Sequence, residues 1–409
     1  MSVRRLAARM SALQRTQLSV QALTRLASVS VFLLASWRDT AHLPLVALQG
    51  ALFALPFALM EALVGRPLAA GLVPGNWDLG RWARSVATAC VLPVGVVGYL
   101  SATVALPQTG VADRLLMITP VLLQLPIEAL FWATTRSGSL RRANLLPQLT
   151  AVGTVIGAVA FVAVGLRVDV AAVPTQVGVL AWAVLRLPPA RRDQVSPGLR
   201  PGLSVGSVYC FATVIDLSYS IALPSVAGAV AGQATVVVLR AMDLAFGPFH
   251  VLLSASTRED VVAGRRSPRW TAVRGLTVAA LLAVSAAMVL GGARVRGLLA
   301  ADLAAVGVTV VALYCAYKAL LMVSTWLSIR HMIRAVPRRY LVSAVGSRVV
   351  AFAVLAVVVV QASRPGDLVL LLVVGEVLVV VWFLARMRSG GRADDTVAVV
   401  PGGGEAVRL

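Results

Sequence analysis

The sequence predicts an all-α polytopic membrane protein with twelve transmembrane helices in two six-helix lobes related by pseudo-two-fold symmetry. Three observations support this fold class: the composition, the number of apolar segments and the distribution of basic residues between them. Of the 409 residues, 59% are hydrophobic and only 13% are charged. A water-soluble protein of this size needs more polar surface to cover its cores. We therefore expect the chain to lie in a lipid bilayer.

The apolar segments have the length that a bilayer requires. A hydrocarbon core about 30 Å thick needs about 20 helical residues, and an open β-strand cannot satisfy its backbone hydrogen bonds there. Reading the runs between charges, Pro and Gly gives twelve segments. They span residues 16–36, 41–64, 84–106, 115–135, 145–166, 170–186, 203–224, 226–255, 273–292, 303–327, 343–362 and 366–386.

The basic residues between these segments alternate from one side to the other. With the N-terminus in the cytoplasm, every predicted cytoplasmic segment is basic, as the positive-inside rule requires. The opposite loops hold only Arg38, Arg114, Arg167, Arg294, Arg296 and Arg364. Adding or removing one helix would destroy this alternation. We therefore expect a multi-pass protein of the plasma membrane with both termini in the cytoplasm.

The net charge of +20 arises from 37 Lys and Arg against 17 Asp and Glu. In a membrane protein such an excess is typical of cytoplasmic loops, so we expect no nucleic-acid partner. The cysteines and histidines are scattered, which predicts no metal site and no cofactor. They are Cys90, Cys210, Cys315, His42, His250 and His331.

The longest predicted cytoplasmic loop divides the chain. Residues 188–202 are rich in Pro, Gly and charge, which is typical of a linker. They separate an N-terminal lobe, residues 1–187, from a C-terminal lobe, residues 203–387, an organisation expected of transporters built from internal repeats. Residues 388–409 are Gly-rich and predict a disordered cytoplasmic tail. No loop is long enough to fold as a catalytic domain, so we do not expect an enzyme.

Three prolines recur at equivalent places. Pro56, Pro126 and Pro248 each precede a basic residue by ten positions, and two of them fall on the second helix of their lobe. Prolines kink helices, and membrane helices tolerate such kinks. The prolines are therefore either ordinary kinks or hinges that allow each lobe to bend during a transport cycle.

Two stretches of the sequence resemble a known group. Residues 238–255 (VLRAMDLAFGPFHVLLSA) and 123–146 (LLQLPIEALFWATTRSGSLRRANL) resemble the eighth and fourth helices of the multidrug/oligosaccharidyl-lipid/polysaccharide (MOP) exporter superfamily, particularly its polysaccharide-flippase branch. The resemblance implies two lobes around a central cavity, alternating access, and transport of lipid-linked sugars or of small cations.

Three cations fall inside the predicted helices: Arg25, Arg240 and Lys318. Charges deep in a bilayer usually face a cavity or a partner. In flippases that the sequence resembles, cationic side chains hold the pyrophosphate of the lipid carrier, and a guanidinium matches phosphate oxygens well. The alternative for Arg25 is an ion pair with Glu61 or Glu376.

The other two cations also allow two interpretations. Arg240 shares a helical face with Asp243 and could pair with it, or with Asp216 of the preceding helix. Lys318 shares a face with Tyr314, which predicts a cation beside a ring that stacks on a sugar. Tyr317 should point elsewhere. A structural Lys bonded to a neighbouring helix is the alternative.

Three carboxylates are candidates for ion coupling: Glu128, Asp216 and Asp243. Glu128 lies two residues beyond Pro126, where a carboxylate next to loosened backbone could take up a proton or a cation. A salt bridge within the same lobe is the alternative.

The function predicted from these features is a flippase of lipid-linked oligosaccharide or polysaccharide precursors. Its expected partners are the lipid-linked saccharide, the bilayer and enzymes of glycan assembly. A cation-coupled multidrug antiporter is the alternative, and the charge of the cavity distinguishes the two. A polytopic glycosyltransferase, suggested only by Arg38 and Asp39, and a non-transporting membrane scaffold are further alternatives.

Overall fold

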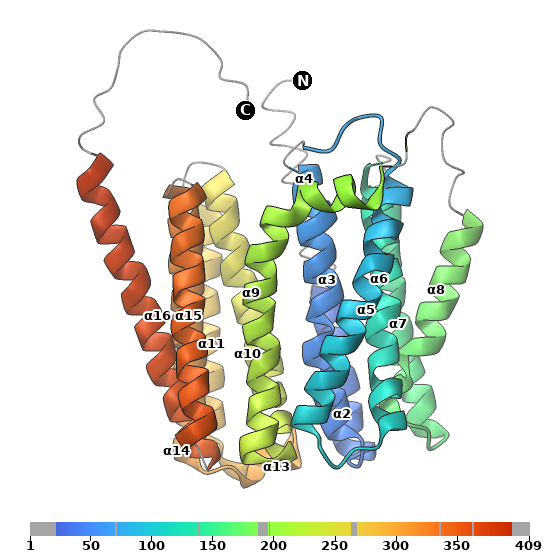
Figure 1. The fold of residues 1–409 in the computed structure, drawn as a ribbon. Helices are drawn as coiled ribbons and strands as arrows, with labels where there is room; N and C mark the ends of the chain where they lie inside the picture. Colours follow the sequence, from blue (N-terminus) through green and yellow to red (C-terminus); the bar gives the residue numbers. More distant parts are fainter. Residues whose placement is uncertain are drawn as a thin grey trace.

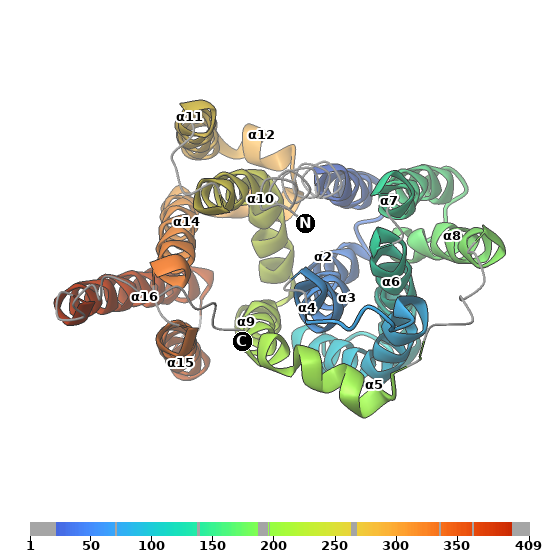
Figure 2. The same cartoon turned by 90° about the horizontal axis from the view of Figure 1, so that it is seen from above.

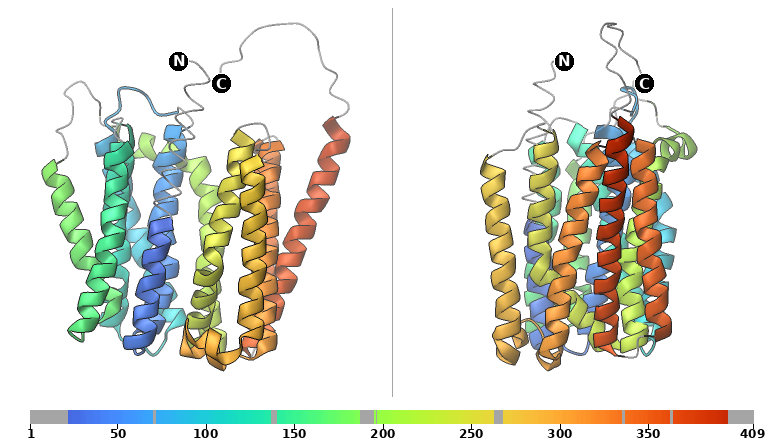
Figure 3. Two further views of the ribbon diagram at one scale, coloured as in Figure 1. Left: turned by 180° about the vertical axis from the view of Figure 1, so that it is seen from behind. Right: turned by 90° about the vertical axis from the view of Figure 1, so that its left-hand side faces the viewer.

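The computed structural model describes residues 22–69, 72–136, 140–186, 195, 197–262, 268–334, 337–361 and 364–394. These residues form a bundle of long helices that run between two opposite faces (Figures 1 and 3). We call the face where helix 22–38 begins and α16 ends the near face, at the top of Figure 1, and the opposite one the far face. The described residues contain no β-strand, only an isolated bridge between Trp77 and Val195.

The first half of the chain begins with helix 22–38. It continues with α2 (Leu43–Leu52), α3 (Ala54–Met60), the π-helix η1 (Glu61–Gly65), α4 (Arg66–Ala69), α5 (Leu79–Ala105), α6 (Val111–Arg136), α7 (Leu140–Ala163), the 3-10 helix η2 (Val168–Val170) and α8 (Ala172–Arg186).

The second half contains α9 (Leu199–Ala231), α10 (Gln233–Val262), α11 (Pro268–Leu290), the short α12 (Gly292–Gly297) and α13 (Ala301–Ala305), α14 (Val308–Arg334), α15 (Pro337–Gln361) and α16 (Pro365–Asp394). The α16 helix thus extends beyond residue 388, where the predicted tail begins, and residues 395–409 lie outside the described residues.

The predicted all-α membrane fold is confirmed. In the described chain, nine helices are long and apolar enough to cross a bilayer, and a shorter apolar helix covers Val168–Ala183. Each of the twelve predicted segments contains helix. That all twelve cross the bilayer stays a prediction.

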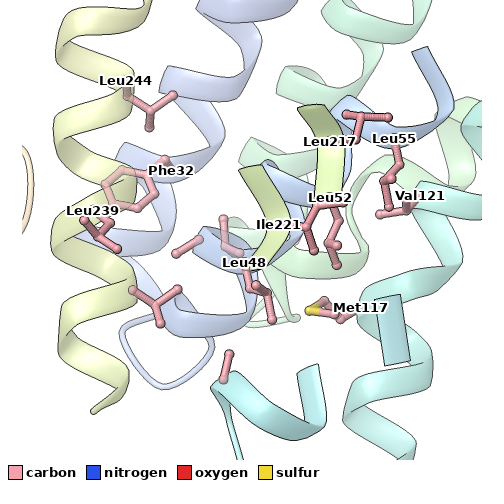
Figure 4. Packing of buried hydrophobic residues seen from close by; sticks show 14 of the residues in the cluster. Phe32, Leu48, Leu52, Leu55, Met117, Val121, Leu217, Ile221, Leu239 and Leu244 are labelled. Carbon is pink, nitrogen blue, oxygen red and sulfur yellow. The ribbon is translucent and has the colours of Figure 1, made fainter. Parts of the chain in front are cut away.

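The two halves occupy different sides of the bundle, with α9 and α10 between them (Figure 2). Helices α5 to α8 lie on one side, and α11, α15 and α16 lie on the other. The apolar core continues across this middle region: Phe32 of helix 22–38 lies beside Leu239 and Leu244 of α10 (Figure 4). Ile221 of α9 lies near Leu52 of α2 in the same view.

The chain between the halves is attached to the first half at the near face. The amide of Asp78 donates to the carbonyl of Val195 at 2.9 Å, and the amide of Val195 donates to the carbonyl of Asn76 at 2.8 Å. Helix α9 begins at Leu199, inside the predicted linker, and its first turns run across the near face beside α5 (Figures 1 and 2). Most of the predicted linker, residues 187–194, lies outside the described residues.

The three predicted hinge prolines differ in their effect on the helices that contain them. The helix before Pro56 is interrupted at Phe53, between α2 and α3, because Pro56 lacks the N–H that would bond to the carbonyl of Leu52. The same helix then widens into the π-helix η1. In contrast, α6 and α10 continue through Pro126 and Pro248. Hinge motion at these prolines stays a prediction.

Arg167, Asp169 and Asp113 form a salt-bridge cluster at the far face of the first half, which we call the ionic clasp. Arg167 donates from Nε and Nη2 to the carboxylate of Asp169, at 3.0 and 2.7 Å, and from Nη1 to Asp113 at the start of α6. Asp169 is 1% exposed, so its charge depends on this partner. The hydrogen bonds that Arg167 donates to Asp169, and then that to Asp113, raise the pKa of Arg167, which keeps the clasp charged.

Asp39 completes this region with its two carboxylate oxygens. Oδ2 accepts from the amide of Val168 at 2.9 Å, and Oδ1 lies 2.6 Å from Nδ1 of His42. Both oxygens of Asp39 therefore have structural partners in the loop between helix 22–38 and α2. Of the two residues that suggested a glycosyltransferase, Arg38 and Asp39, the carboxylate thus has a structural role.

We expect Arg167→Ala to lower the free energy of unfolding by roughly 3 kcal/mol, because it leaves the buried carboxylate of Asp169 without a cation. Thermal unfolding in lipid nanodiscs measures this loss. Arg38→Ala removes an exposed arginine from the same face and serves as the control. Equal melting temperatures for the two variants would contradict a structural role of the clasp.

Candidate functional site

Arg240 is the most buried of the predicted membrane cations, with 8% of its surface exposed. It lies on α10 about 10 Å from the start of the helix at the far face. Its Nη2 donates to Oγ of Ser28 in helix 22–38 at 2.7 Å. Arg240 therefore connects the second half of the chain to the first half through a neutral hydroxyl.

The guanidinium of Arg240 also lies directly against Gly50 of α2. A Cβ atom at Gly50 would be 2.6 Å from both Nε and Nη2 of Arg240. No side chain larger than hydrogen fits there without displacing the guanidinium. Gly50 thus creates the space that Arg240 occupies.

Arg25 makes the reciprocal contact. It is half-buried in helix 22–38, and its Nη1 would be 3.2 Å from a Cβ atom at Gly247 of α10. Each arginine therefore lies on a glycine of the opposite half. The positions of both guanidinium groups depend on how closely helix 22–38 and α2 approach α10.

Asp243 does not pair with Arg240, although the two share a helical face. Its carboxylate bonds to the ammonium of Lys318 on α14 and lies 3.4 Å from the hydroxyl of Tyr314. Of the two interpretations of Lys318, the structure agrees with a structural lysine that bonds to a neighbouring helix. Asp243 still attracts the charge of Arg240, whereas Arg25 repels it.

Two aromatic rings surround Lys318. Its Nζ lies 5.3 Å from the ring centroid of Tyr314 and 5.1 Å from that of Tyr317, within the range of cation–π contacts. The prediction that Tyr317 points elsewhere is wrong, because the long Lys318 side chain reaches both rings from their own helix. Tyr314 also donates to the carbonyl of Leu239 at 3.3 Å.

The charges of this region do not cancel. Within the described part of the chain, neither Arg25 nor Arg240 has a carboxylate within 4 Å, whereas Lys318 is neutralised by Asp243. Among the described side chains of this region, three cations and one carboxylate leave two positive charges without an ion pair. The expected alternatives for Arg25 have other partners: Glu61 bonds to Arg66 at 3.5 Å, and Glu376 accepts from Ser324.

Glu128 lies apart from these cations, on α6 in the first half. It is 7% exposed, and its Oε1 accepts from Nε2 of Gln124 at 2.9 Å. The alternative of a salt bridge in the same lobe does not occur among the described residues. Asp216 lies in α9, but its side chain is outside the described residues.

The sequence did not single out Ser28, Gly50, Gly247 or Gln124. Gln124 lies one helical turn before Glu128, and that spacing was a usable signal for a hydrogen bond. The two glycines carry no comparable signal, because only the close approach of another helix distinguishes them from the remainder of the 33 glycines.

Known transporters share this architecture over almost their entire length. The inward closed conformation of the lipid II flippase MurJ matches 90% of this chain and 86% of its own, with a TM-score of 0.63 and 9% identity. An inward-facing multidrug resistance MATE family transporter of the MOP superfamily matches 97% of both chains, with a TM-score of 0.56 and 17% identity. No protein-family model and no curated protein sequence matches the chain.

A third structure is a MOP superfamily transporter from Pyrococcus furiosus, whose binding pocket is described as having reverse polarity. It matches 96% of both chains, with a TM-score of 0.50 and 16% identity. The chain has the fold of the MOP transporters. The shared fold covers both halves of the chain. The contacts of Arg25 and Arg240 described above lie where the two halves meet.

We expect the Asp243–Lys318 pair to be energetically coupled in the folded MOP bundle. Lys318→Met should destabilise the protein by about 1–3 kcal/mol, because it leaves a carboxylate unpaired among apolar helices. Asp243→Asn in the same chain should recover part of this loss. A double-mutant cycle from chemical or thermal unfolding measures the coupling energy, and strictly additive effects would contradict the pairing.

Proposed function

We propose that this protein is a flippase that moves lipid-linked oligosaccharide or polysaccharide precursors across the plasma membrane by alternating access. The observation that supports this most directly is the pair of arginines at the junction of the two halves, neither of which has a carboxylate partner in the described chain. Two uncompensated positive charges match the two negative charges of a diphosphate diester. Guanidinium groups also present the forked donors that phosphate oxygens accept.

The position of these arginines is consistent with alternating access. Arg25 and Arg240 come from opposite halves, and each contacts the other half. A relative movement of the halves therefore changes the distance between the two guanidinium groups. A transport cycle can use this change to bind and then release an anionic headgroup.

In this proposal the near face is cytoplasmic, and both termini lie on that side. The basic loops of the sequence support this orientation through the positive-inside rule. The substrate is expected to come from glycan-assembly enzymes, with its diphosphate among the arginines and its lipid chain in the bilayer. The similarity to the lipid II flippase MurJ supports the same class of substrate.

A cation-coupled multidrug antiporter is the second candidate. The similarity to MATE transporters and the carboxylate of Glu128, which has no cationic partner among the described residues, favour it. The uncompensated arginines argue against it, because they repel a cationic drug. Uptake of a fluorescent organic cation into proteoliposomes, measured with and without an ion gradient, distinguishes this candidate from the flippase.

The flippase proposal predicts that Arg25→Ala and Arg240→Ala each slow transport by about 10- to 100-fold, because each removes a charge-assisted hydrogen bond to the diphosphate. The measurement is the movement of fluorescent lipid-linked oligosaccharide between leaflets of proteoliposomes. Arg38→Ala, an exposed arginine on the far face, should transport at the wild-type rate. Equal rates for all variants would remove the arginines from the mechanism.

Failure of the wild-type protein to move any of several lipid-linked saccharides would contradict the flippase function itself and favour a scaffold. To exclude loss of folding, the melting temperature of each variant is measured in the same lipids. Arg→Lys variants at both positions should retain intermediate activity, since they keep the charge but lose the forked donors.

We also expect Gly50→Ala to reduce transport nearly as much as Arg240→Ala. The added methyl group would occupy the position of the guanidinium, 2.6 Å from Nε. Gly247→Ala should have a smaller effect through Arg25, because that contact is 3.2 Å. Comparison of the two variants in the same flipping assay tests the order, and the reverse order would contradict the assigned contacts.

A further inference from the structure

Arg296 is a buried cation that takes no part in the interactions described above. It lies at the far face, in the connection between α11 and α14, and only 4% of the residue is exposed. This connection is outside the apolar spans, which end at Leu290 and begin again at Val308. With the near face in the cytoplasm, the positive-inside rule disfavours basic residues here, yet Arg294 and Arg296 occur two residues apart. Their presence on this side therefore requires a specific reason.

Glycines fold this connection tightly against the end of α11. Gly292 has a φ of 67°, in the left-handed region, where the chain turns into α12. A Cβ atom at Gly291 would be 2.4 Å from both the carbonyl oxygen of Ala287 and Cγ2 of Val295, so only glycine allows this turn. Helix α12 packs against α11, and α13 packs against α12 and α10 (Figures 1 and 2). The backbone that carries Arg296 is therefore held in one place.

The guanidinium of Arg296 lacks the hydrogen bonds that a buried cation requires. Its Nε and Nη1 are both enclosed and have no acceptor among the described residues. No carboxylate of the described chain lies within 4 Å of the guanidinium. Burying an N–H group without an acceptor is unfavourable, and more so when the group is charged. Arg296 therefore destabilises the fold unless a further group bonds to it.

Two structural explanations for Arg296 fail. Asp302 of α13 is the carboxylate closest to it in sequence, but within the described part of the chain Asp302 forms no ion pair. Burial raises the pKa of Asp302, which makes its charged form less favourable. A cation in the last turn of a helix can also bond to the free carbonyl groups there, but Nε and Nη1 donate to none in the described chain. Neither an ion pair nor a helix cap therefore accounts for Arg296.

The third nitrogen of this guanidinium is open to the outside. Nη2 also has no acceptor among the described residues, but it is not enclosed as Nε and Nη1 are. Because a guanidinium is planar, Nη2 shares a pair of parallel N–H groups with each of the other two nitrogens. A small rotation of the side chain brings one of these enclosed donors to the surface together with Nη2. An anion that reaches Nη2 then meets two donors, the arrangement that suits the oxygens of a phosphate.

The surroundings of α12 favour a phosphate that belongs to a lipid. Leu290, at the end of α11, is 83% exposed, and Leu298, directly after α12, is 65% exposed. Arg294 on the same short helix is exposed as well. Exposed leucine and arginine side chains together at the end of a membrane span are typical of the interface, where the lipid chains meet the headgroups. We therefore expect Nη2 of Arg296 to lie at the level of the headgroup phosphates.

We propose that Arg296 binds the phosphate of a lipid headgroup in the leaflet at the far face. The phosphate oxygens accept from Nη2 and from a second nitrogen of the guanidinium, while the lipid chains lie against the exposed leucines at positions 290 and 298. Arg294 adds attraction at longer range. The headgroup belongs to a phospholipid of the bilayer or to a lipid-linked saccharide, which share this phosphate chemistry.

This site does not rest on the proposed transport function. It lies in a connection outside the spans, away from the junction where Arg25 and Arg240 contact the opposite halves. A protein that moves no lipid-linked saccharide can still bind a phospholipid at Arg296. The experiments below therefore measure stability and lipid binding, and none of them measures transport.

Thermal unfolding of the delipidated full-length protein in detergent tests whether the charge of Arg296 is unsatisfied. Arg296→Met should raise the melting temperature, because it replaces an orphaned cation by an apolar side chain of similar length. Arg294→Met removes the same charge from an exposed position of the same helix, so it should leave the melting temperature unchanged. A melting temperature that falls in Arg296→Met but not in Arg294→Met would show a structural role for Arg296 and would overturn the proposal.

Native mass spectrometry of the same proteins measures the binding of phosphatidylglycerol and resolves each successive lipid. One binding step should weaken by about 10-fold in Arg296→Met, because the phosphate loses a pair of charge-assisted hydrogen bonds. The same step should weaken by no more than about threefold in Arg294→Met, the effect of an exposed charge. Arg296→Lys keeps the charge without the parallel donors, so it should lie between the two.

Equal dissociation constants at every step for wild type, Arg296→Met and Arg296→Lys would overturn the site. Arg296→Lys retains a cation at this position, so its comparison with wild type keeps the proposal testable if Arg296→Met does not fold. Basic residues of the near face also attract anionic lipids, but their contribution is the same in all four proteins. The matched charge of Arg294→Met separates a bond at Arg296 from the loss of net charge.

Two further ligands identify the source of the phosphate. Inorganic phosphate should leave the melting temperature of the delipidated wild type unchanged, whereas a rise equal to that with phosphatidylglycerol would overturn the assignment to a lipid. A lipid-linked oligosaccharide is then added in competition with phosphatidylglycerol. Displacement at the step that depends on Arg296 would identify the lipid-linked saccharide as the preferred ligand, and failure to displace would identify the phospholipid. Either of these two results supports the headgroup site.

Discussion

The cost of an unpaired charge in an apolar interior is the constraint on which the arrangement of this bundle depends. Where the charges are structural, the fold neutralises them: Arg167 bonds to Asp169 and Asp113, and Lys318 bonds to Asp243. Among the described residues, Arg25, Arg240 and Glu128 have no oppositely charged partner within 4 Å. The two arginines lie between the halves, and Glu128 lies within the first half. Such exceptions persist only where they have a use or a ligand.

The sequence predicts the helices and the unusual charges well, because both depend on local composition. A run of about 20 apolar residues can form only helix in a bilayer. Arg25, Arg240 and Lys318 are conspicuous because charges inside such runs are rare. The end of α16 is less predictable, since glycines lower helix propensity without preventing a helix, and the structure extends it through Gly390 and Gly391.

The partners of these charges could not be predicted, because they depend on how the helices rotate against one another. Asp243 is three residues from Arg240, yet it bonds to Lys318 of α14, 75 positions further along the chain. The flexible Lys318 side chain reaches the carboxylate. Arg240 instead donates to Ser28 and packs against Gly50, both in the first half. Helical spacing limits the possible pairs, but packing between helices decides among them.

The short helix α2 contacts both Arg240 at the junction of the halves and α6 in the interior of the first half. Its Gly50 provides the space for the guanidinium of Arg240, while the adjacent Gln49 bonds to the carbonyl of Met117 on α6. The interruption at Phe53, which Pro56 imposes, separates α2 from α3, so the two parts of this segment are not one continuous helix. The position of α2 therefore sets both the space beside the guanidinium of Arg240 and the hydrogen bond of Gln49 to α6. Through this short helix, the packing at the junction of the halves and the packing inside the first half depend on one another.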